Sequence, residues 1–196
     1  MSVAAIILAA GASSRMGQPK QLLDWGGQPL VRAVASVALS ARLDSVVVVV
    51  GAAGQRVAAT LDGLPVRVVL NAAYATGQAS SLHAGIAALP AEIEAALVLL
   101  GDQPFVGVQI IDALVQAWRE SSAQIVAPSF GGQRGNPVLF DQRVFQELRE
   151  VQGDQGARAI IQANQERVLL LPFAQLRPLE DIDTPEDYQR IQQLEF

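Results

Sequence analysis

The chain has 196 residues, of which 51% are apolar and 5% aromatic, a length and composition that predict one domain, residues 1–196, with an aliphatic core. Its 14 basic and 19 acidic residues give a net charge of −5, which argues against nucleic acid as a partner, because a polyanionic backbone requires a basic face. The absence of cysteine excludes disulfides and cysteine-ligated metal centres, and we expect the one histidine, His83, to be structural rather than catalytic.

The first predicted element is a strand over residues 3–8, an aliphatic run with no polar face that is typical of a central parallel strand. The whole apolar run, residues 3–10, is far shorter than the roughly 20 residues of a membrane span. No basic segment precedes it, as one would in a signal peptide. We therefore expect a soluble, cytoplasmic protein that makes no membrane contact.

A glycine-punctuated loop that begins at Gly11 and ends at Lys20 follows this strand. Glycines let a ligand approach the backbone closely, and the hydroxyls of Ser13 and Ser14 add hydrogen-bond donors. Arg15 and Lys20 add two positive charges, and Lys20 is the single lysine among the chain's 14 basic residues. This composition is typical of a triphosphate-binding loop, although the spacing matches neither the Walker A nor the GxGxxG pattern. The alternative is a solvent-exposed connector.

Strands and helices then alternate, which predicts an α/β fold with parallel strand connections. Further strands are expected at residues 45–50, 66–70, 95–100, 124–127, 137–140 and 167–171. Helices are expected at residues 29–41, 55–61, 80–89 and 108–121, with one more begun by Asp141 and a last one capped by Thr184. Between residues 130 and 158 several glycines loosen the pattern, which we interpret as an inserted lid or acceptor region.

Three aspartates follow predicted strands or precede a predicted helix. Asp102 lies just beyond the strand at residues 95–100, at the edge where open α/β sheets bind ligands. A carboxylate there can hold Mg²⁺, or it can simply cap the turn. Asp181 and Asp183 form a second acidic pair before the last helix, and their alternative role is to prepare the start of that helix.

Polar residues also follow the strand at residues 66–70. They are Asn71, Gly77, Ser80 and Ser81. Their side chains and backbone amides can read the edge of a nucleobase. The alternative is that Ser80 or Ser81 caps a helix over residues 82–89 without any ligand.

Several segments resemble the motifs of one known family and occur in that family's order. They are LAAGASSRMGQPKQLL (residues 8–23), GQASSLHAG (77–85), GDQP (101–104), RGNPVLF (134–140), GDQGAR (153–158) and DIDTPEDY (181–188). By these motifs, which span nearly the whole chain, the sequence resembles the MobA-like nucleotidyltransferases and is most similar to the molybdenum cofactor cytidylyltransferases. The resemblance implies a Rossmann-like, three-layer α/β nucleotidyltransferase fold with a mostly parallel central sheet.

The resemblance also implies roles for individual residues. Arg15 and Lys20 would contact the phosphates of a nucleoside triphosphate and, with Asp102, form the catalytic set. Asp102 and Asp183 would hold Mg²⁺, with the choice between Asp181 and Asp183 left open. The residues expected toward the acceptor are Asn136, Gly153, Gly156 and Arg158. The nucleotide-binding residues are Leu8, Ala9, Ala10, Gly11, Ser13, Ser14, Arg15, Lys20, Asn71, Gly77, Ser80, Ser81 and Asp102.

The base is expected to be cytosine, because relatives that transfer cytidylyl groups have LAAG where guanylyl-transferring ones have LAGG, and residues 8–11 here are LAAG. The predicted function is therefore the Mg²⁺-dependent joining of CTP to molybdopterin or its molybdenum form, giving the cytosine dinucleotide cofactor and pyrophosphate. Transient contact with a recipient molybdoenzyme or its chaperone is also expected. The alternatives are the same chemistry with GTP, or with CTP and a sugar or polyol phosphate, and a non-catalytic cofactor-binding chaperone. A dinucleotide-dependent oxidoreductase is a further alternative, against which the absence of GxGxxG argues.

Overall fold

The structure is a computed structural model that describes residues 1–174 and 177–195. Its strands are β1 (Val3–Ala9), β2 (Asp24–Trp25), β3 (Gln28–Pro29), β4 (Ser45–Val50), β5 (Arg67–Leu70), β6 (Ala95–Leu100), β7 (Ile125–Phe130), β8 (Gln133–Arg134), β9 (Val138–Asp141) and β10 (Val168–Phe173). Its α-helices are α1 (Leu30–Leu39), α2 (Gly54–Ala59), α3 (Gln78–Ala87), α4 (Val108–Glu120), α5 (Phe145–Glu150), α6 (Arg158–Ala163) and α7 (Pro185–Glu195).

An eight-stranded sheet forms the middle of the molecule, in the order β10-β7-β9-β6-β1-β4-β5, with β8 paired to β7. β1 runs parallel to both of its neighbours, with Ile6 opposite Val47 of β4 and Val98 of β6. β5 and β10 also run parallel to their partners β4 and β7. β9 runs antiparallel to β6 and β7. The predicted α/β fold with a mostly parallel sheet and a central first strand is thus confirmed.

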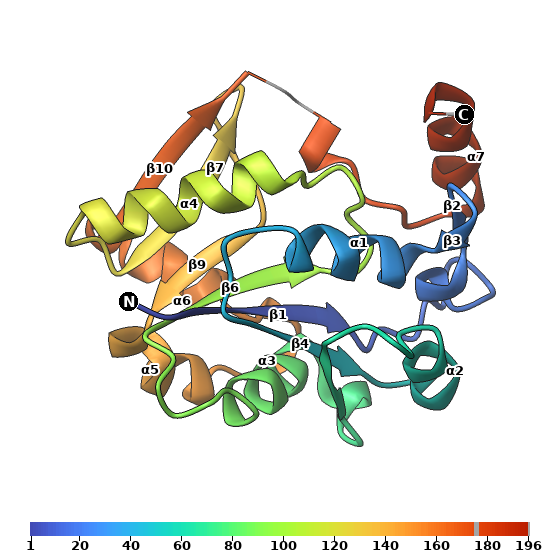
Figure 1. Cartoon of the computed structure of the whole chain (residues 1–196), viewed down its shortest axis with the longest axis horizontal. Helices are drawn as coiled ribbons and strands as arrows, with labels where there is room; N and C mark the ends of the chain where they lie inside the picture. The colour runs from blue at the N-terminus through green and yellow to red at the C-terminus, as the bar shows by residue number, and fades with distance from the viewer. Residues whose placement is uncertain (175–176, 196) are drawn as a thin grey trace.

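Helices cover both faces of the sheet and give three layers, with α1 and α4 over one face and α3 and α5 against the other (Figure 1). Successive side chains of a strand point to opposite faces, so β1 contributes to both layers. Val3, Ala5 and Ile7 pack into the core shared with α1 and α4, and Ile6 packs into the core shared with α3. The strand has no polar face because both of its faces are covered.

The glycine-rich region after residue 130 belongs to the sheet, so its interpretation as an inserted lid is wrong for residues 138–141. Gly131 and Gly132, with φ of 57° and 84°, form the tight turn between β7 and β8. β9 then lies between β6 and β7, and its residues Val138, Leu139 and Phe140 are buried. The strand has apolar side chains on both faces because it is covered on both.

Other differences from the sequence-based expectation concern the ends of elements. Asp141 ends β9 and also caps a 3-10 helix, Gln142–Val144, that leads into α5 at Phe145, so the helix expected to begin at Asp141 is confirmed. Its carboxylate accepts hydrogen bonds from the Arg143 amide and the Trp118 indole, both at 2.9 Å. β7 extends to Phe130. The short helix α6 and the β2-β3 hairpin were not predicted, because each contains too few residues for a periodic pattern.

The last helix, α7, lies beside the β2-β3 hairpin, at the end of the sheet to which β1 points (Figure 1). Ile182 and Ile191 are fully buried in a small cluster with Met16, Leu23 and Leu30. This cluster fixes the segment before α7 next to the loop that follows β1. Two regions at opposite ends of the sequence therefore meet at the carboxyl edge of the sheet.

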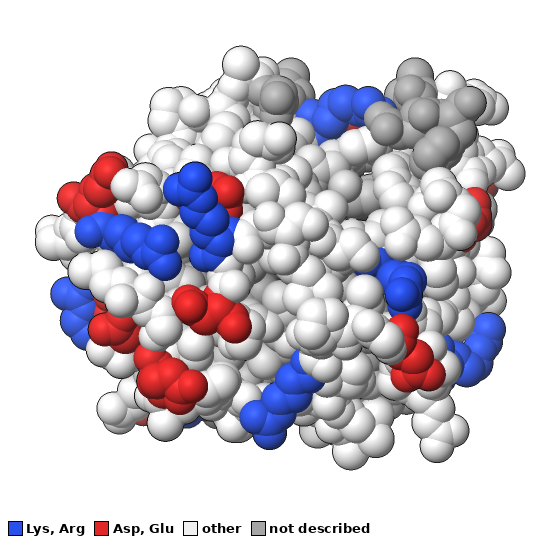
Figure 2. Space-filling view, viewed as in Figure 1, with Lys and Arg blue, Asp and Glu red and all other residues white. Residues whose placement is uncertain are grey.

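On the face shown in Figure 2, basic and acidic side chains are mixed, and wide areas carry neither. Within residues 1–174 and 177–195, no helix is both long enough and apolar enough to cross a membrane.

Candidate active site

The loop after β1 is held in shape by hydrogen bonds on its inner side. The amide of Gln21, a buried side chain, donates to the carbonyl of Gly11 at 3.0 Å, and the backbone amide of Lys20 donates to the Ser13 hydroxyl at 3.1 Å. Ser13 has a φ of 53°, a conformation that non-glycine residues seldom adopt. The loop is therefore a fixed turn that presents the side chain of Lys20.

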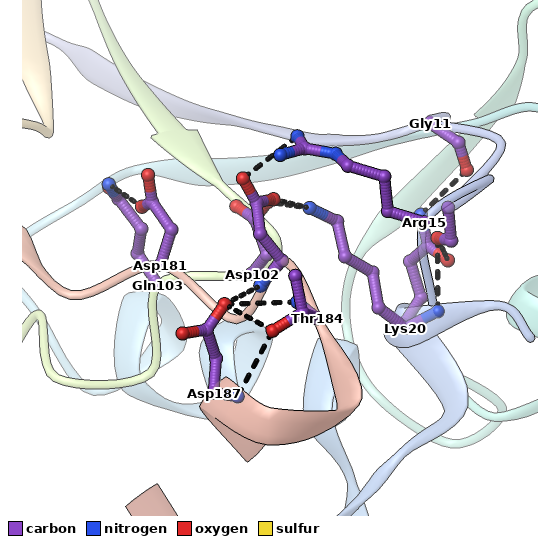
Figure 3. A network of polar contacts seen from close by, with 11 residues as sticks. Gly11, Arg15, Lys20, Asp102, Gln103, Asp181, Thr184 and Asp187 are labelled. Atoms are coloured by element: carbon purple, nitrogen blue, oxygen red, sulfur yellow. Dashed lines mark hydrogen bonds and ion pairs between the residues drawn. The ribbon is translucent and has the colours of Figure 1, made fainter. Parts of the chain in front are cut away.

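Lys20 lies at the centre of a network of opposite charges, drawn in Figure 3. Its ammonium group pairs with the Asp102 carboxylate at the end of β6 and with an oxygen of Asp183 at 3.0 Å. The Arg15 guanidinium pairs with the other oxygen of Asp183 at 2.9 Å. Lys20 and Asp102 are largely buried, with side chains 16% and 18% exposed, whereas Arg15 is 71% exposed. The carboxylates of Asp102 and Asp183 thus converge on one cationic atom.

The opposite charges in this network shift the pKa values of Lys20 and Asp183 so that both groups favour their charged forms. Burial alone would lower the pKa of Lys20, but the charges and hydrogen bonds of Asp102 and Asp183 outweigh it and raise the pKa above its ordinary value. Burial would raise the pKa of Asp183, but Lys20 and Arg15 outweigh it and lower the pKa. Lys20 is therefore protonated and Asp183 ionised across the physiological range.

A capping motif at the start of α7 holds Asp183 in position. The Asp187 carboxylate accepts hydrogen bonds from the Thr184 amide and hydroxyl, both at 3.0 Å, and the Thr184 hydroxyl accepts the Asp187 amide at 3.2 Å. The prediction that Thr184 caps this helix is confirmed. Asp183 is the residue immediately before the cap, so the orientation of the helix determines where its carboxylate lies.

The structure separates the two aspartates whose roles the sequence left open. Asp183 shares the ammonium of Lys20 with Asp102, whereas Asp181 accepts a hydrogen bond from the Gln103 side chain and points away from Lys20 (Figure 3). Within the described residues, no group of three or more histidine, cysteine, aspartate or glutamate side chains is arranged around a metal position. Two convergent carboxylates still fit a hard divalent cation, whose remaining positions are commonly filled by water and phosphate oxygens. The donor chemistry is thus compatible with Mg²⁺ at Asp102 and Asp183.

Arg15, Lys20, Asp102 and Asp183 line a cleft of about 760 Å³, which we call the main cleft. It contains nine of the residues predicted to bind nucleotide: Leu8, Ala10, Gly11, Ser14, Arg15, Lys20, Gly77, Ser81 and Asp102. Four predicted residues lie outside its lining: Ala9, Ser13, Asn71 and Ser80. Ala9 is buried in the core on the α1 side, because it alternates with the residues that face the cleft. Tyr74 and Gln78 line the cleft and were not predicted.

Asn71 does not line the main cleft, but it contacts Ser81, which does. Its side-chain amide donates to the hydroxyls of Ser80 at 2.9 Å and Ser81 at 3.0 Å, and its carbonyl oxygen accepts the Ala73 amide at 2.9 Å. Helix α3 begins at Gln78, so both serines lie inside the helix, and the alternative that one of them caps it is wrong. Asn71 instead connects the end of β5 to the first turn of α3.

The residues predicted to lie toward the acceptor are mostly found in a second hollow next to the main cleft. Asn136, Gly156 and Arg158 line a smaller hollow of about 40 Å³, and Arg158 also lines the main cleft. Gly153 does not line either hollow, but it touches Gly77: a Cβ atom on Gly77, whose φ is 113°, would lie 2.5 Å from the Gly153 carbonyl carbon. Glycine is needed there because the two loops meet backbone to backbone.

The smaller hollow also contains Arg134, a residue that the sequence reasoning missed. It stands first in the segment RGNPVLF, and it is one of thirteen arginines that composition alone does not distinguish. Its special feature is that it has no ion pair or side-chain hydrogen bond within residues 1–174 and 177–195, which can be recognised only from the three-dimensional structure.

Comparisons with known proteins agree with this geometry. Residues 5–168 match the MobA-like NTP transferase domain. Nicotine blue oxidoreductase of Paenarthrobacter nicotinovorans is 33% identical to this chain, covering 96% of each protein. Purine catabolism protein PucB of Bacillus subtilis (strain 168) is 32% identical, covering 95% of this chain and 94% of that protein. A probable molybdenum cofactor guanylyltransferase of Natronomonas pharaonis is 28% identical, covering 94% of each.

Solved structures agree at the level of the whole fold. Rv0371c from Mycobacterium tuberculosis H37Rv superposes with a TM-score of 0.89 at 28% identity, covering 98% of both chains. A complex of Rv0371c with manganese superposes with a TM-score of 0.85 at 25% identity, covering 98% of this chain and 99% of that chain. Since the domain match covers most of the chain and the relatives cover nearly all of it, this chain belongs to the MobA-like NTP transferase family.

Proposed function

We propose that the protein is a Mg²⁺-dependent cytidylyltransferase that joins CTP to the terminal phosphate of molybdopterin or its molybdenum form. The observation that carries this proposal is the convergence of Asp102 and Asp183 on the ammonium of Lys20, inside a cleft of about 760 Å³. That volume falls in the range of roughly 300–1,000 Å³ typical of small-molecule sites. A buried lysine between two carboxylates suits a ligand that brings both negative phosphates and a divalent cation.

The reaction requires no covalent enzyme intermediate. An oxygen of the acceptor phosphate forms a bond to the α-phosphorus of CTP, and the bond from the α-phosphorus to the oxygen bridging the β-phosphate breaks, with its electron pair leaving on pyrophosphate. Lys20 and Arg15 would stabilise the negative charge on the transferred and leaving groups. The fixed loop around Ser13 and Gln21 would hold Lys20 in place, so that positioning and electrostatics supply most of the rate enhancement.

The carboxylates of Asp102 and Asp183 would hold the cation. When bound, Mg²⁺ neutralises charge on phosphate oxygens and on the leaving pyrophosphate. The relative Rv0371c, which was solved in complex with manganese, supports a divalent metal in this family. In the structure of the present chain both carboxylates contact Lys20, so the lysine and the cation depend on the same two partners.

Cytosine is the proposed base because of Ala10. This residue lines the main cleft together with Tyr74 and Ser81, and it is 4% exposed, so its methyl group is closely packed where the cleft is walled by α3. A methyl at this position reduces the room for a purine. GTP remains the second candidate, because a relative that is 28% identical is named a probable molybdenum cofactor guanylyltransferase.

The acceptor side rests on Asn136, Gly156 and Arg158, which line the smaller hollow next to the main cleft. The acceptor that we propose is of the molybdopterin type, in line with the name of the guanylyltransferase relative. A recipient molybdoenzyme or its chaperone would then take the product. The cysteine-free composition is compatible with the cytoplasmic location that we propose with this activity.

An oxidoreductase is a candidate of another class, favoured by the 33% identical relative named nicotine blue oxidoreductase. The two functions make different demands on Lys20 and Asp102. A nucleotidyl transfer needs the paired charges for triphosphate and metal, whereas hydride transfer from a nicotinamide cofactor does not require a divalent cation. Metal dependence therefore distinguishes the candidates.

The deciding experiment incubates the protein with a molybdopterin source, Mg²⁺ and each nucleoside triphosphate in turn, and measures pyrophosphate release and the product mass. We expect a cytosine dinucleotide product with CTP, none after chelation, and a normal rate for the control variant Arg149→Gln, whose exposed guanidinium lies outside the cleft. A guanine product would establish the GTP alternative. Metal-independent oxidation of a reduced nicotinamide cofactor would establish the oxidoreductase, and binding without turnover of any triphosphate would establish the carrier.

A further inference from the structure

Arg134 is a partly buried arginine with no compensating carboxylate. Most arginines of the described chain have an ion pair or a hydrogen bond, as Arg143 has with Asp141 and Arg167 with Glu147. In residues 1–174 and 177–195, Arg134 has neither, and the other arginines without such a partner are exposed on the surface. The side chain is half-buried, and partial burial of a guanidinium without a partner has a desolvation cost.

The nearest charge makes this situation worse. Burial lowers the pKa of Arg134, and the positive charge of Arg158 lowers it further. Arg158, at the start of α6, likewise has no ion pair within the described residues. Arg158 is exposed and Arg134 is half-buried, and both line one hollow, which we call the arginine hollow. An anion bound there would offset the burial of Arg134 and the repulsion between the two charges.

Apart from Gln78 and Asn136, the side chains that line the rest of the arginine hollow are apolar. Its floor contains Val98 of β6 together with Val138 and Phe140 of β9, which are 8%, 3% and 0% exposed. Asn136 adds one amide at the rim. The hollow therefore offers two guanidinium groups and an amide above a dry aliphatic and aromatic surface.

The arginine hollow is continuous with the main cleft. The two share four lining residues, Leu8, Gln78, Leu100 and Arg158. An anion held by the arginine pair would consequently lie next to the cleft that we assign to the nucleotide.

We infer that Arg134 and Arg158 together bind the phosphate monoester of the acceptor and hold it for attack on the α-phosphorus. Arginine suits this task because its planar fork matches phosphate oxygens in a bidentate way. The apolar floor would contact the part of the acceptor that carries the phosphate. This inference rests on the proposed function for the identity of the acceptor, whereas the existence of an anion site at the arginine pair can be measured without it.

The test uses phenyl phosphate, a phosphate monoester with a flat apolar body, and measures its binding calorimetrically to the full chain without nucleotide. The variants are Arg134→Gln and Arg158→Gln, with Arg149→Gln as the control that removes an equal charge from an exposed site. We expect each of the first two to weaken binding by about tenfold or more, because a charge-assisted hydrogen bond is lost, and the control to bind as the wild type does. The CTP affinity of Arg134→Gln, measured in parallel, should change by no more than about twofold, because Arg134 does not line the main cleft.

A stability measurement separates a binding role from a structural one. If Arg134 serves ligand binding, Arg134→Gln should unfold at the same temperature as the wild type or higher, because it removes an unpaired charge that repels Arg158. Phenyl phosphate should raise the unfolding temperature of the wild type but not of the variant. A marked loss of stability in the unliganded variant would instead assign Arg134 a structural role and overturn the inference.

The remaining outcomes are equally decisive. Failure of phenyl phosphate to bind the wild type, or equal binding to Arg134→Gln and Arg149→Gln, overturns the anion site. A loss of CTP affinity as large as the loss of phenyl phosphate affinity assigns the pair to the triphosphate instead of the acceptor. If phenyl phosphate binds through the pair but the protein transfers no nucleotide, the anion site stands and the proposed function fails.

Discussion

In the main cleft, Lys20 is paired with Asp102 and Asp183 and forms the paired end of the site, whereas in the adjoining arginine hollow, the arginine end, Arg134 and Arg158 have no ion pair within residues 1–174 and 177–195. The first end neutralises its own charge and can keep its shape without a ligand. The second end carries uncompensated charge that only an added anion can neutralise. Substitutions at the paired end should therefore change both stability and chemistry, and those at the arginine end should change affinity alone.

Removal of Lys20 should have the largest effect on the paired end. Lys20→Ala leaves Asp102 and Asp183 facing each other and removes the cation from the developing phosphate charge, so we expect turnover to fall by on the order of 100-fold or more. Lys20→Arg should restore little, because a planar fork replaces a compact charge. Pyrophosphate release measures both effects, and folding is checked by circular dichroism. Near-wild-type rates in both variants would contradict a phosphate role for Lys20.

Asp102→Asn tests the metal at the same end. The substitution keeps the size of the side chain but removes the negative charge that a hard cation requires, so metal affinity and turnover should fall together, each on the order of tenfold or more. Titration with manganese under electron paramagnetic resonance measures the affinity directly. If Asp102 merely capped a turn, asparagine would replace it well, and both quantities would stay near their wild-type values.

The paired end should also respond to acid. The pKa of Asp183 is lowered in the folded protein, so its ion pairs stabilise the fold above the unfolded pKa of about 3.9, and this contribution is lost as the pH falls through the lower folded value. With divalent cations removed by a chelator, Asp183→Asn should therefore unfold at a temperature about 1 to 3 °C lower than the wild type at neutral pH. The effect is small because partly exposed ion pairs contribute no more than about 1 kcal/mol to the free energy of unfolding. The difference should shrink as the pH falls below the unfolded pKa and vanish once Asp183 is protonated in the folded protein.

The control for this experiment is Asp62→Asn, because the exposed Asp62 side chain has no ion pair within the described residues. Its unfolding temperature should follow that of the wild type at every pH. A difference between Asp183→Asn and the wild type that persists at low pH would show that Asp183 acts through packing and not through its charge.

The sequence predicted the sheet better than the arrangement of its strands. Residues 45–50 form β4 as expected, because a continuous apolar run is what a strand covered on both faces requires. The place of β9 between β6 and β7 was not predictable in the same way. Its own residues specify a buried strand, but the order of strands in the sheet depends on the neighbours with which it pairs.

The paired end and the arginine end also differ in how far the sequence predicts them. Lys20 and Asp102 are recognisable from residue type and from their places after strands, whereas the contact of Lys20 with Asp183, 163 positions away, depends on the packing of α7. Arg134 is not recognisable from sequence at all. Its significance lies in a partner that is missing, and a missing partner is visible only in three dimensions.

The smallest effect is expected at Ala10, which lines the main cleft. Removal of one methyl group changes the discrimination between substrates by only about 1 to 3 kcal/mol, so Ala10→Gly should relax the preference for CTP over GTP without reversing it. Ala10 is closely packed: a Cβ atom placed on Gly51 would lie 2.8 Å from the Ala10 Cβ, and Tyr74 lies next to both. Because this wall is tight, the space gained should benefit the larger purine.

Competition between CTP and GTP in pyrophosphate release, in the presence of acceptor and Mg²⁺, gives the ratio of CTP to GTP use for the wild type and for Ala10→Gly. A wild type that prefers GTP would overturn the cytidylyl assignment, while an unchanged ratio in the variant would show that Ala10 does not face the base.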